Sequence, residues 1–200
     1  RTRLPAIHST ACCLPNAWRF FGALPEYVFS WDEEGVWVNL YTSSTLRHTL
    51  HSGAPLDLSV QTAYPHEGRV EISVGGDASA SWTLRLRIPA WCRRAVVTDP
   101  AGGRSEHAGP AYAALERTWH PGDRVLLEME MPVRAIVSAP EIAANAGQVA
   151  LARGPLVYCL EQVDATDPIE RLGLACRPSQ DARGAQAVWE PDLLGGVYAL

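Results

Sequence analysis

Between residues 27 and 133 the hydrophobic positions recur mostly at every second residue, which is the period of a β-strand. The clearest case is 81–91, where the even positions from Trp82 to Ile88 are apolar and the odd positions between them are Thr and Arg. This alternation is typical of an antiparallel strand with one buried face. Further strands are expected at 27–31, 35–41, 56–65, 68–76 and on both sides of the turn 120–123 within 112–133. Strands at this spacing, separated by turns rich in Gly, Pro and Asp, indicate a β-sandwich.

One segment, 15–24, carries a helical pattern instead. Trp18, Phe21 and Leu24 recur at a spacing of three and mark one apolar face. Pro15 suits the first helical position, because its missing N–H would have no partner inside the helix. Pro25 ends the helix, because the residue before a proline is disfavoured in α geometry.

The alternation stops between 134 and 148, in an alanine-rich stretch that we expect to be a domain boundary. Strands resume in 149–162 around a Gly-Pro turn or bulge, and the pattern thins after 163, where 177–187 is expected to be an exposed loop. We therefore expect the last segment to begin a second β-rich domain that is incomplete.

The composition narrows the class of protein. Of the 200 residues 47% are hydrophobic and 20% are charged, as in ordinary globular proteins, and no apolar run is long enough to cross a membrane. The net charge of −5, without a basic cluster, argues against nucleic acid as a partner. The chain has five cysteines, an odd number, and they are not spaced as in small secreted proteins held together by disulfides. We therefore expect free thiols and a cytoplasmic location. The chain opens without methionine, and we expect it to be a piece of a longer protein.

The adjacent pair Cys12–Cys13, before the predicted helix, is the main candidate for chemistry. One interpretation is two small buried hydrophobes at the start of the helix. A disulfide between the two is disfavoured, since neighbouring Cα atoms lie about 3.8 Å apart and disulfides usually need more than about 4.4 Å. A third interpretation is a zinc-thiolate site in which the metal deprotonates a nucleophilic sulfur. Two sulfurs do not complete a zinc site, and the remaining candidates Cys92, Cys159 and Cys176 lie in or near strands, which favours packing roles.

Several spaced motifs then point to one family. The block CCLPNAWR, with LPEYVFS and VWVNLYTSS after it, resembles the motif region of glycoside hydrolase family 127, the β-L-arabinofuranosidase family. LRLRIPAWC, RTWHPGDRVLLEMEMPVR and GQVALARGPLVYCLEQ resemble the trailing β domains of that family, in the same order. The resemblance reaches to about residue 163.

The resemblance implies an (α/α)6 barrel followed by β-sandwich domains. Residues 1–30 would then be the C-terminal end of the barrel, 31–134 a sandwich and 135–200 the start of the second β-rich domain. Cys12 matches the nucleophile, which also binds zinc, and Cys13 matches a second zinc ligand. The other ligands, a Glu and a Cys, and the glutamate acid/base would lie before Arg1, so this segment alone should be inactive. The implied substrate is a terminal β-L-arabinofuranoside.

Two alternatives of another class stay open. One is a non-catalytic sandwich module that binds carbohydrate or supports a catalytic domain. The other is a homodimerisation module, because trailing domains of the family take part in subunit contacts. For other polar and aromatic residues we expect structural roles: a loop for His8, a turn hydrogen bond for Asn16, a solvated turn for 32–34, packing or solvent exposure for Glu161, and core positions for Trp37, Trp82, Trp91 and Trp119.

Overall fold

The computed structural model describes residues 14–76, 80–160, 162–163, 165, 167–168, 187–191 and 197–199. Within these residues the chain divides into two compact units, one ending at Glu130 and the other starting at Met131. No helix among the described residues is long and apolar enough to span a membrane.

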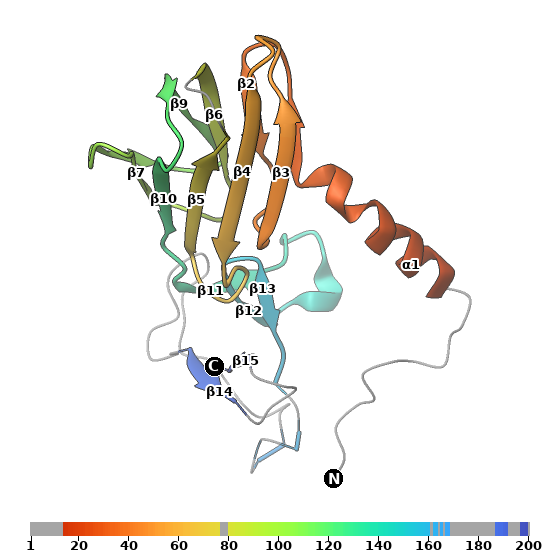
Figure 1. Cartoon of the computed structure of the whole chain (residues 1–200). Helices are drawn as coiled ribbons and strands as arrows, with labels where there is room; N and C mark the ends of the chain where they lie inside the picture. The colour runs from red at the N-terminus through yellow and green to blue at the C-terminus, as the bar shows by residue number, and fades with distance from the viewer. Residues whose placement is uncertain are drawn as a thin grey trace. The chain divides into compact units, whose positions relative to one another are not determined.

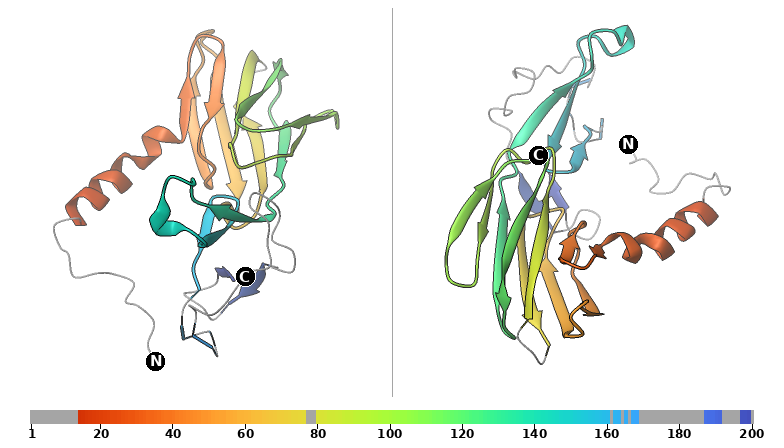
Figure 2. Two further views of the ribbon diagram at one scale, coloured as in Figure 1. Left: turned by 180° about the vertical axis from the view of Figure 1, so that it is seen from behind. Right: turned by 90° about the horizontal axis from the view of Figure 1, so that it is seen from above.

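The first unit begins with the α-helix α1 (Leu14–Ala23) and the 3-10 helix η2 (Leu24–Tyr27), and two sheets follow (Figure 1). The four-stranded sheet has the order β1 (Phe29–Trp31), β2 (Gly35–Val38), β6 (Ala80–Ile88), β9 (Ala111–Trp119). The six-stranded sheet has the order β3 (Ser44–Thr49), β4 (Pro55–Thr62), β5 (Arg69–Gly75), β10 (Arg124–Met129), β7 (Ala95–Thr98), β8 (Arg104–His107). The hairpin of β7 and β8, in yellow-green, projects at the margin of this unit (Figure 2).

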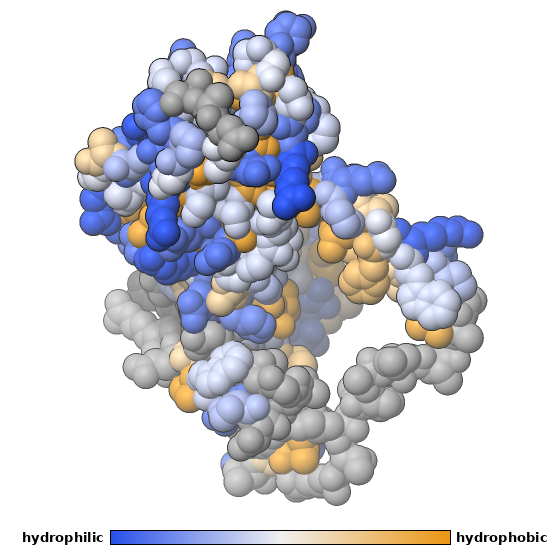
Figure 3. Space-filling view, viewed as in Figure 1, coloured by the Kyte–Doolittle hydropathy of each residue, from blue (hydrophilic) through white to orange (hydrophobic). Residues whose placement is uncertain are grey.

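The helix α1 confirms the prediction at 15–24 to within one residue at each end, but none of its side chains is buried. Trp18 is 71% exposed and Phe21 66% exposed, and Phe20 beside them is exposed as well. Figure 3 shows hydrophobic residues, in orange, gathered along this helix. The apolar side chains of α1 therefore have no covering partner among the described residues.

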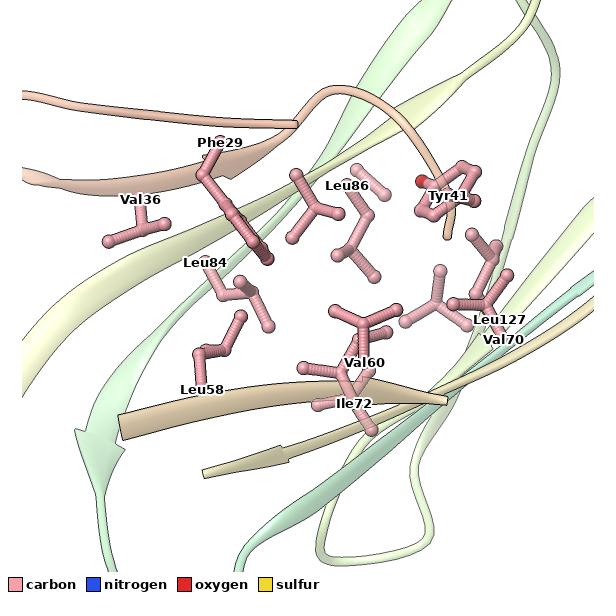
Figure 4. Packing of buried hydrophobic residues seen from close by; sticks show 14 of the residues in the cluster. Phe29, Val36, Tyr41, Leu58, Val60, Val70, Ile72, Leu84, Leu86 and Leu127 are labelled. Atoms are coloured by element: carbon pink, nitrogen blue, oxygen red, sulfur yellow. The ribbon is translucent and has the colours of Figure 1, made fainter. Parts of the chain in front are cut away.

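The core lies between the two sheets and is made of alternate residues of their strands (Figure 4). The predicted phase of β6 is confirmed, since Trp82, Leu84, Leu86 and Ile88 are all buried. Trp119 of β9 is almost fully buried, donates from Nε1 to the backbone oxygen of Trp82 at 2.9 Å, and stacks on the Trp82 ring at a centroid distance of 5.0 Å. Buried aromatic rings of this size supply much of the hydrophobic stabilisation of a domain.

One strand pair departs from the antiparallel pattern. β2 and β6 run parallel, with Gly35 opposite Thr83, and the chain between them forms β3, β4 and β5 of the other sheet. Gly35 has no space for a side chain, because a Cβ atom there would lie 2.0 Å from the backbone oxygen of Thr83. The parallel pair therefore depends on a glycine at the first position of β2.

In the first unit, the strands that the sequence pattern missed are β3, β7 and β8. β3 and β8 lie at the two ends of the six-stranded sheet, and β3 alternates half-buried with exposed residues while β8 is mostly exposed. β7 is short and nearly continuously buried, so it lacks a polar phase. The turn at 32–34 is confirmed, since the Asp32 Oδ1 accepts hydrogen bonds from the backbone N–H groups of Glu34 at 2.8 Å and Gly35 at 3.0 Å.

The second unit contains a three-stranded antiparallel sheet of β11 (Val133–Val137), β12 (Val149–Arg153) and β13 (Leu156–Tyr158). The 3-10 helix η3 (Ala143–Asn145) lies between β11 and β12, and a separate pair is formed by β14 (Val188–Glu190) and β15 (Val197–Ala199). The strand–turn–strand pattern predicted for 149–162 is confirmed in β12 and β13, which are joined at Gly154 with φ +56°. Arg134 donates to the backbone oxygen of Gly154 at 3.0 Å.

An exposed ion-pair cluster connects Arg94, directly before β7, to β8 and to the last residue of the first unit. Arg94 donates to the carboxylate of Glu106 in β8 and, at 2.7 Å, to that of Glu130. The hydrogen bonds and charge of the Arg94 guanidinium hold the pKa of the Glu106 carboxyl below its ordinary value. The cluster therefore favours the ionised form of Glu106 in the folded state.

Replacing Gly35 with alanine should destabilise the first unit by about 1–3 kcal/mol, because β2 and β6 must move apart to admit the new methyl group. Urea-induced unfolding monitored by tryptophan fluorescence measures the change. Gly22→Ala in α1 is the control, because no atom lies within 4 Å of its added Cβ, and it should not lower stability. Equal midpoints for Gly35→Ala and the unsubstituted chain would contradict the close approach.

The ion-pair cluster also predicts a pH dependence. A carboxyl whose folded pKa is lowered adds stability at pH values above its unfolded pKa and loses it as the pH falls through the folded pKa. Glu106→Gln should therefore reduce the thermal midpoint near neutral pH, and the difference from the unsubstituted chain should disappear in acid. Thermal melts from neutral to acidic pH test this, with the exposed turn variant Glu33→Gln as the control. A difference independent of pH would show that the Glu106 charge is not involved.

Candidate functional site

The predicted site residues Cys12 and Cys13 lie outside the described residues, as do His8, Glu161 and Cys176. The described chain starts at Leu14, which is the first residue of α1 and follows Cys13 directly. Asn16 lies in the first turn of α1, where its Oδ1 accepts a hydrogen bond from Arg19 at 3.4 Å. This local bond agrees with the structural role expected for Asn16.

The described cysteines, Cys92 and Cys159, are both free thiols. Cys92 is fully buried, and its Sγ donates to the backbone oxygen of Arg94 at 3.2 Å. Burial raises the pKa of the Cys92 thiol, so it stays protonated and is a poor metal ligand or nucleophile. The packing role expected for Cys92 is thus confirmed, while Cys159 is exposed.

A metal centre is not formed within the described part of the chain. There, no three or more His, Cys, Asp or Glu side chains come together in a way that could hold an ion. The metal ligands predicted from the sequence, Cys12 and Cys13, precede this part of the chain. Their assignment as ligands therefore stays a prediction.

The four tryptophans, which could in principle form a sugar-stacking surface, do not form one. Trp82 and Trp119 are in the core, as expected. The core position expected for Trp37 is wrong, because Trp37 is half-buried and lies on the opposite phase of β2 from the buried Val36 and Val38. The Arg85 guanidinium lies over the Trp37 ring at 4.2 Å and pairs with Glu34 at 2.6 Å. Trp91 packs against the core and stacks with Tyr64 at 6.5 Å between ring centroids. Exposed, coplanar pairs are therefore absent among these four residues.

Sequence reasoning missed a polar cavity of about 370 Å³ between the β7–β8 hairpin and β9. Val97 and Leu115 contribute apolar surface to it, and its polar lining includes Asp99, Ser105, Glu116 and Arg117. The available signal was Arg117 itself, since it falls in phase with Leu115 and Trp119 on the apolar side of the 111–119 alternation. A charged residue at an apolar phase often marks a site or a protected strand edge.

The contrast between the two described cysteines can be tested by alkylation. Iodoacetamide should modify Cys159 in the folded chain, whereas Cys92 should react only after unfolding, because its thiol is buried and its pKa is raised. Peptide mass spectrometry after a timed reaction, with and without denaturant, distinguishes the cysteines. Equal reaction rates of Cys92 and Cys159 in the folded chain would contradict this assignment.

Comparisons with known proteins agree across both units. The family domain described as "Beta-L-arabinofuranosidase, GH127 middle domain" matches residues 35–131, and the "Glycoside hydrolase family 127 C-terminal domain" matches residues 133–189. A non-reducing end beta-L-arabinofuranosidase of Bifidobacterium longum subsp. longum is 32% identical over 199 residues, which cover 94% of this chain and 28% of that protein.

Solved structures give the same result. A GH127 beta-L-arabinofuranosidase from Geobacillus stearothermophilus T6 is 38% identical, with a TM-score of 0.82, and the match covers 96% of this chain and 30% of that one. A GH127 beta-arabinofuranosidase is 27% identical, with a TM-score of 0.80, over 96% of this chain and 32% of that one. The chain thus spans about 30% of the length of these relatives. Both family domains match in the expected order over most of the chain. The chain therefore belongs to glycoside hydrolase family 127 and corresponds to the C-terminal portion of the family's proteins.

Proposed function

We propose that this chain is part of a retaining glycosidase that hydrolyses terminal β-L-arabinofuranosides with Cys12 as its nucleophile. The observation that carries the proposal is the agreement of both family domains and of a curated β-L-arabinofuranosidase with nearly the whole chain. In the sequence the cysteine pair directly precedes α1, within the 34 residues that come before the first matched domain.

Zinc suits the donor chemistry of the pair. Thiolates are soft ligands that favour zinc among the common divalent metals, and Cys12 and Cys13 would supply two of the four ligands that it prefers. Cys92 does not fit as a further ligand, because it is buried and bonded to a backbone oxygen. The other two ligands would come from sequence outside this chain. When bound, zinc would keep Cys12 in the thiolate form at neutral pH.

In the proposed reaction the Cys12 sulfur attacks C1 of the arabinofuranose, forming a C–S bond while the bond from C1 to the leaving oxygen breaks. The leaving oxygen takes a proton from a general acid outside this chain. Water then attacks C1 and gives a proton to the same group, which is now a general base, the C–S bond breaks, and Cys12 returns to the thiolate, so the sugar keeps its anomeric configuration. General acid assistance is worth about 10²–10⁴-fold, so the 200 residues alone should be nearly inactive.

The apolar side chains of α1 support the predicted role of residues 1–30 as the end of a helical barrel. Trp18, Phe20 and Phe21 are all more than half exposed, although large apolar residues of a helix normally face a core. Joining residues 1–30 to an upstream helical domain would bury these side chains, and the cysteine pair directly precedes their helix in the sequence.

The nucleophile assignment is tested in the protein formed by joining this segment to its native upstream sequence. Cys12→Ser should lower kcat on an aryl β-L-arabinofuranoside by about a thousandfold or more, because a serine hydroxyl is a far weaker nucleophile than a thiolate. Cys159→Ser is the matched control and should leave kcat unchanged, because Cys159 is exposed on another unit. Full activity of Cys12→Ser would overturn the assignment.

The ligand assignment is tested separately by metal analysis of the same protein. Cys13→Ala should lower the zinc content per chain measured by inductively coupled plasma mass spectrometry, since one of the two thiolate ligands from this chain is removed. Cys92→Ala is the control, because its thiol lies in the core. Unchanged zinc in Cys13→Ala would contradict the role of Cys13.

A further inference from the structure

The cavity between the β7–β8 hairpin and β9 lies where the two sheets of the first unit end. β9 is the edge strand of the four-stranded sheet and β8 the edge strand of the six-stranded sheet, so each pairs on one side only. Four consecutive residues of β9, 114–117, line the cavity opposite Ser105 of β8. The backbone groups on the unpaired side of β9 and β8 therefore remain available as hydrogen-bond donors and acceptors.

Arg117 is the unusual residue of this cavity. It follows Leu115 and precedes Trp119 on the inward phase of β9, and its guanidinium lies over the Trp119 ring at 5.4 Å. Its Nε is buried and has no hydrogen-bond partner among the described residues. A buried donor without a partner costs roughly 1–3 kcal/mol, so the inward position of Arg117 is unfavourable for the fold itself and points to a use of its guanidinium at the cavity that it lines.

The charges around the cavity favour a neutral ligand. The two acidic lining residues, Asp99 and Glu116, balance the charge of the two basic ones, Arg104 and Arg117, so the lining carries no net charge. The Asp99 Oδ1 accepts hydrogen bonds from the backbone N–H groups of Ala101 and Gly103. Arg104 lies 3.8 Å from the Glu128 carboxylate. The Ser105 hydroxyl forms a hydrogen bond with the His107 ring at 2.9 Å. The cavity thus presents hydrogen-bond donors and acceptors next to the apolar side chains of Val97 and Leu115. This combination suits a small ring-shaped ligand that carries hydroxyl groups and has a partly apolar face.

We propose that this cavity is a saccharide-binding site, separate from Cys12 and Cys13, that takes one or two neutral sugar residues. Arg117 would donate from its guanidinium to a sugar oxygen, and Glu116 would accept from a hydroxyl group. The volume of about 370 Å³ lies within the range of small-molecule sites. The site would hold carbohydrate without taking part in the reaction.

The test is a titration of the ¹⁵N-labelled 200-residue chain carrying Cys12→Ser, so that binding does not depend on the proposed nucleophile. L-Arabinose, chosen from the proposed function, and D-glucose are the two neutral probes, and D-glucuronate is the anionic one. Either neutral sugar should shift the amide signals of Ser105, Glu116 and Arg117, with a Kd in the millimolar range. Arg117→Met should raise that Kd by about tenfold or more, and Glu116→Gln should raise it a few-fold.

Arg47→Met is the matched control, because Arg47 lies on the other edge strand, β3, is highly exposed and pairs only loosely with Asp57 at 3.9 Å. It should leave the Kd unchanged. Three results would overturn the proposal: no shift with either neutral sugar at about 50 mM, tighter binding of D-glucuronate than of both neutral sugars, or the same Kd in Arg117→Met. Dimerisation of Arg117→Met with unchanged sugar binding would assign Arg117 to edge protection instead. Binding of D-glucose alone would support the site and count against the proposed arabinoside specificity.

Discussion

The first unit depends on strand β6, because that strand pairs with two neighbours and also contributes Trp82, Leu84, Leu86 and Ile88 to the core. It pairs in parallel with β2 and antiparallel with β9, and its apolar phase from Trp82 to Ile88 is buried. Its other phase carries Arg85, whose guanidinium covers Trp37 and pairs with Glu34. One strand therefore joins the helix-proximal strands β1 and β2 to the edge strand β9 on which the saccharide cavity opens.

The elements that could be predicted from sequence are those whose pattern reflects burial on one face. The phase of β6 and the helix α1 follow directly from the spacing of Trp82 and Leu84 in one and of Trp18 and Phe21 in the other. The strands β3 and β8 could not be found in this way, because their side chains are largely polar and sheet ends need little apolar surface. The parallel pairing of β2 with β6 was also hidden, since Gly35 marks only a close approach and does not say which strand approaches.

Some residues of the candidate sites could likewise be predicted from the sequence, and others could not. Cys12 and Cys13 are recognised from a contiguous motif, and the packing role of Cys92 follows from its place beside a buried strand. The cavity at β9 is assembled from the hairpin β7–β8 and from Arg117, so it exists only after the two sheets have met. Its only signal in the sequence was the charged Arg117 at a position where the alternation predicts an apolar residue. That signal alone does not distinguish a ligand site from a protected strand edge.

The stacked Trp82 and Trp119 rings in the core have a spectroscopic consequence. Two indoles whose centroids lie 5.0 Å apart, at an interplanar angle of 29°, form a coupled pair of chromophores. Their electronic transitions should mix and give a paired positive and negative circular dichroism band. That signal would report the joining of β6 with β9 inside an otherwise larger protein, without any added label.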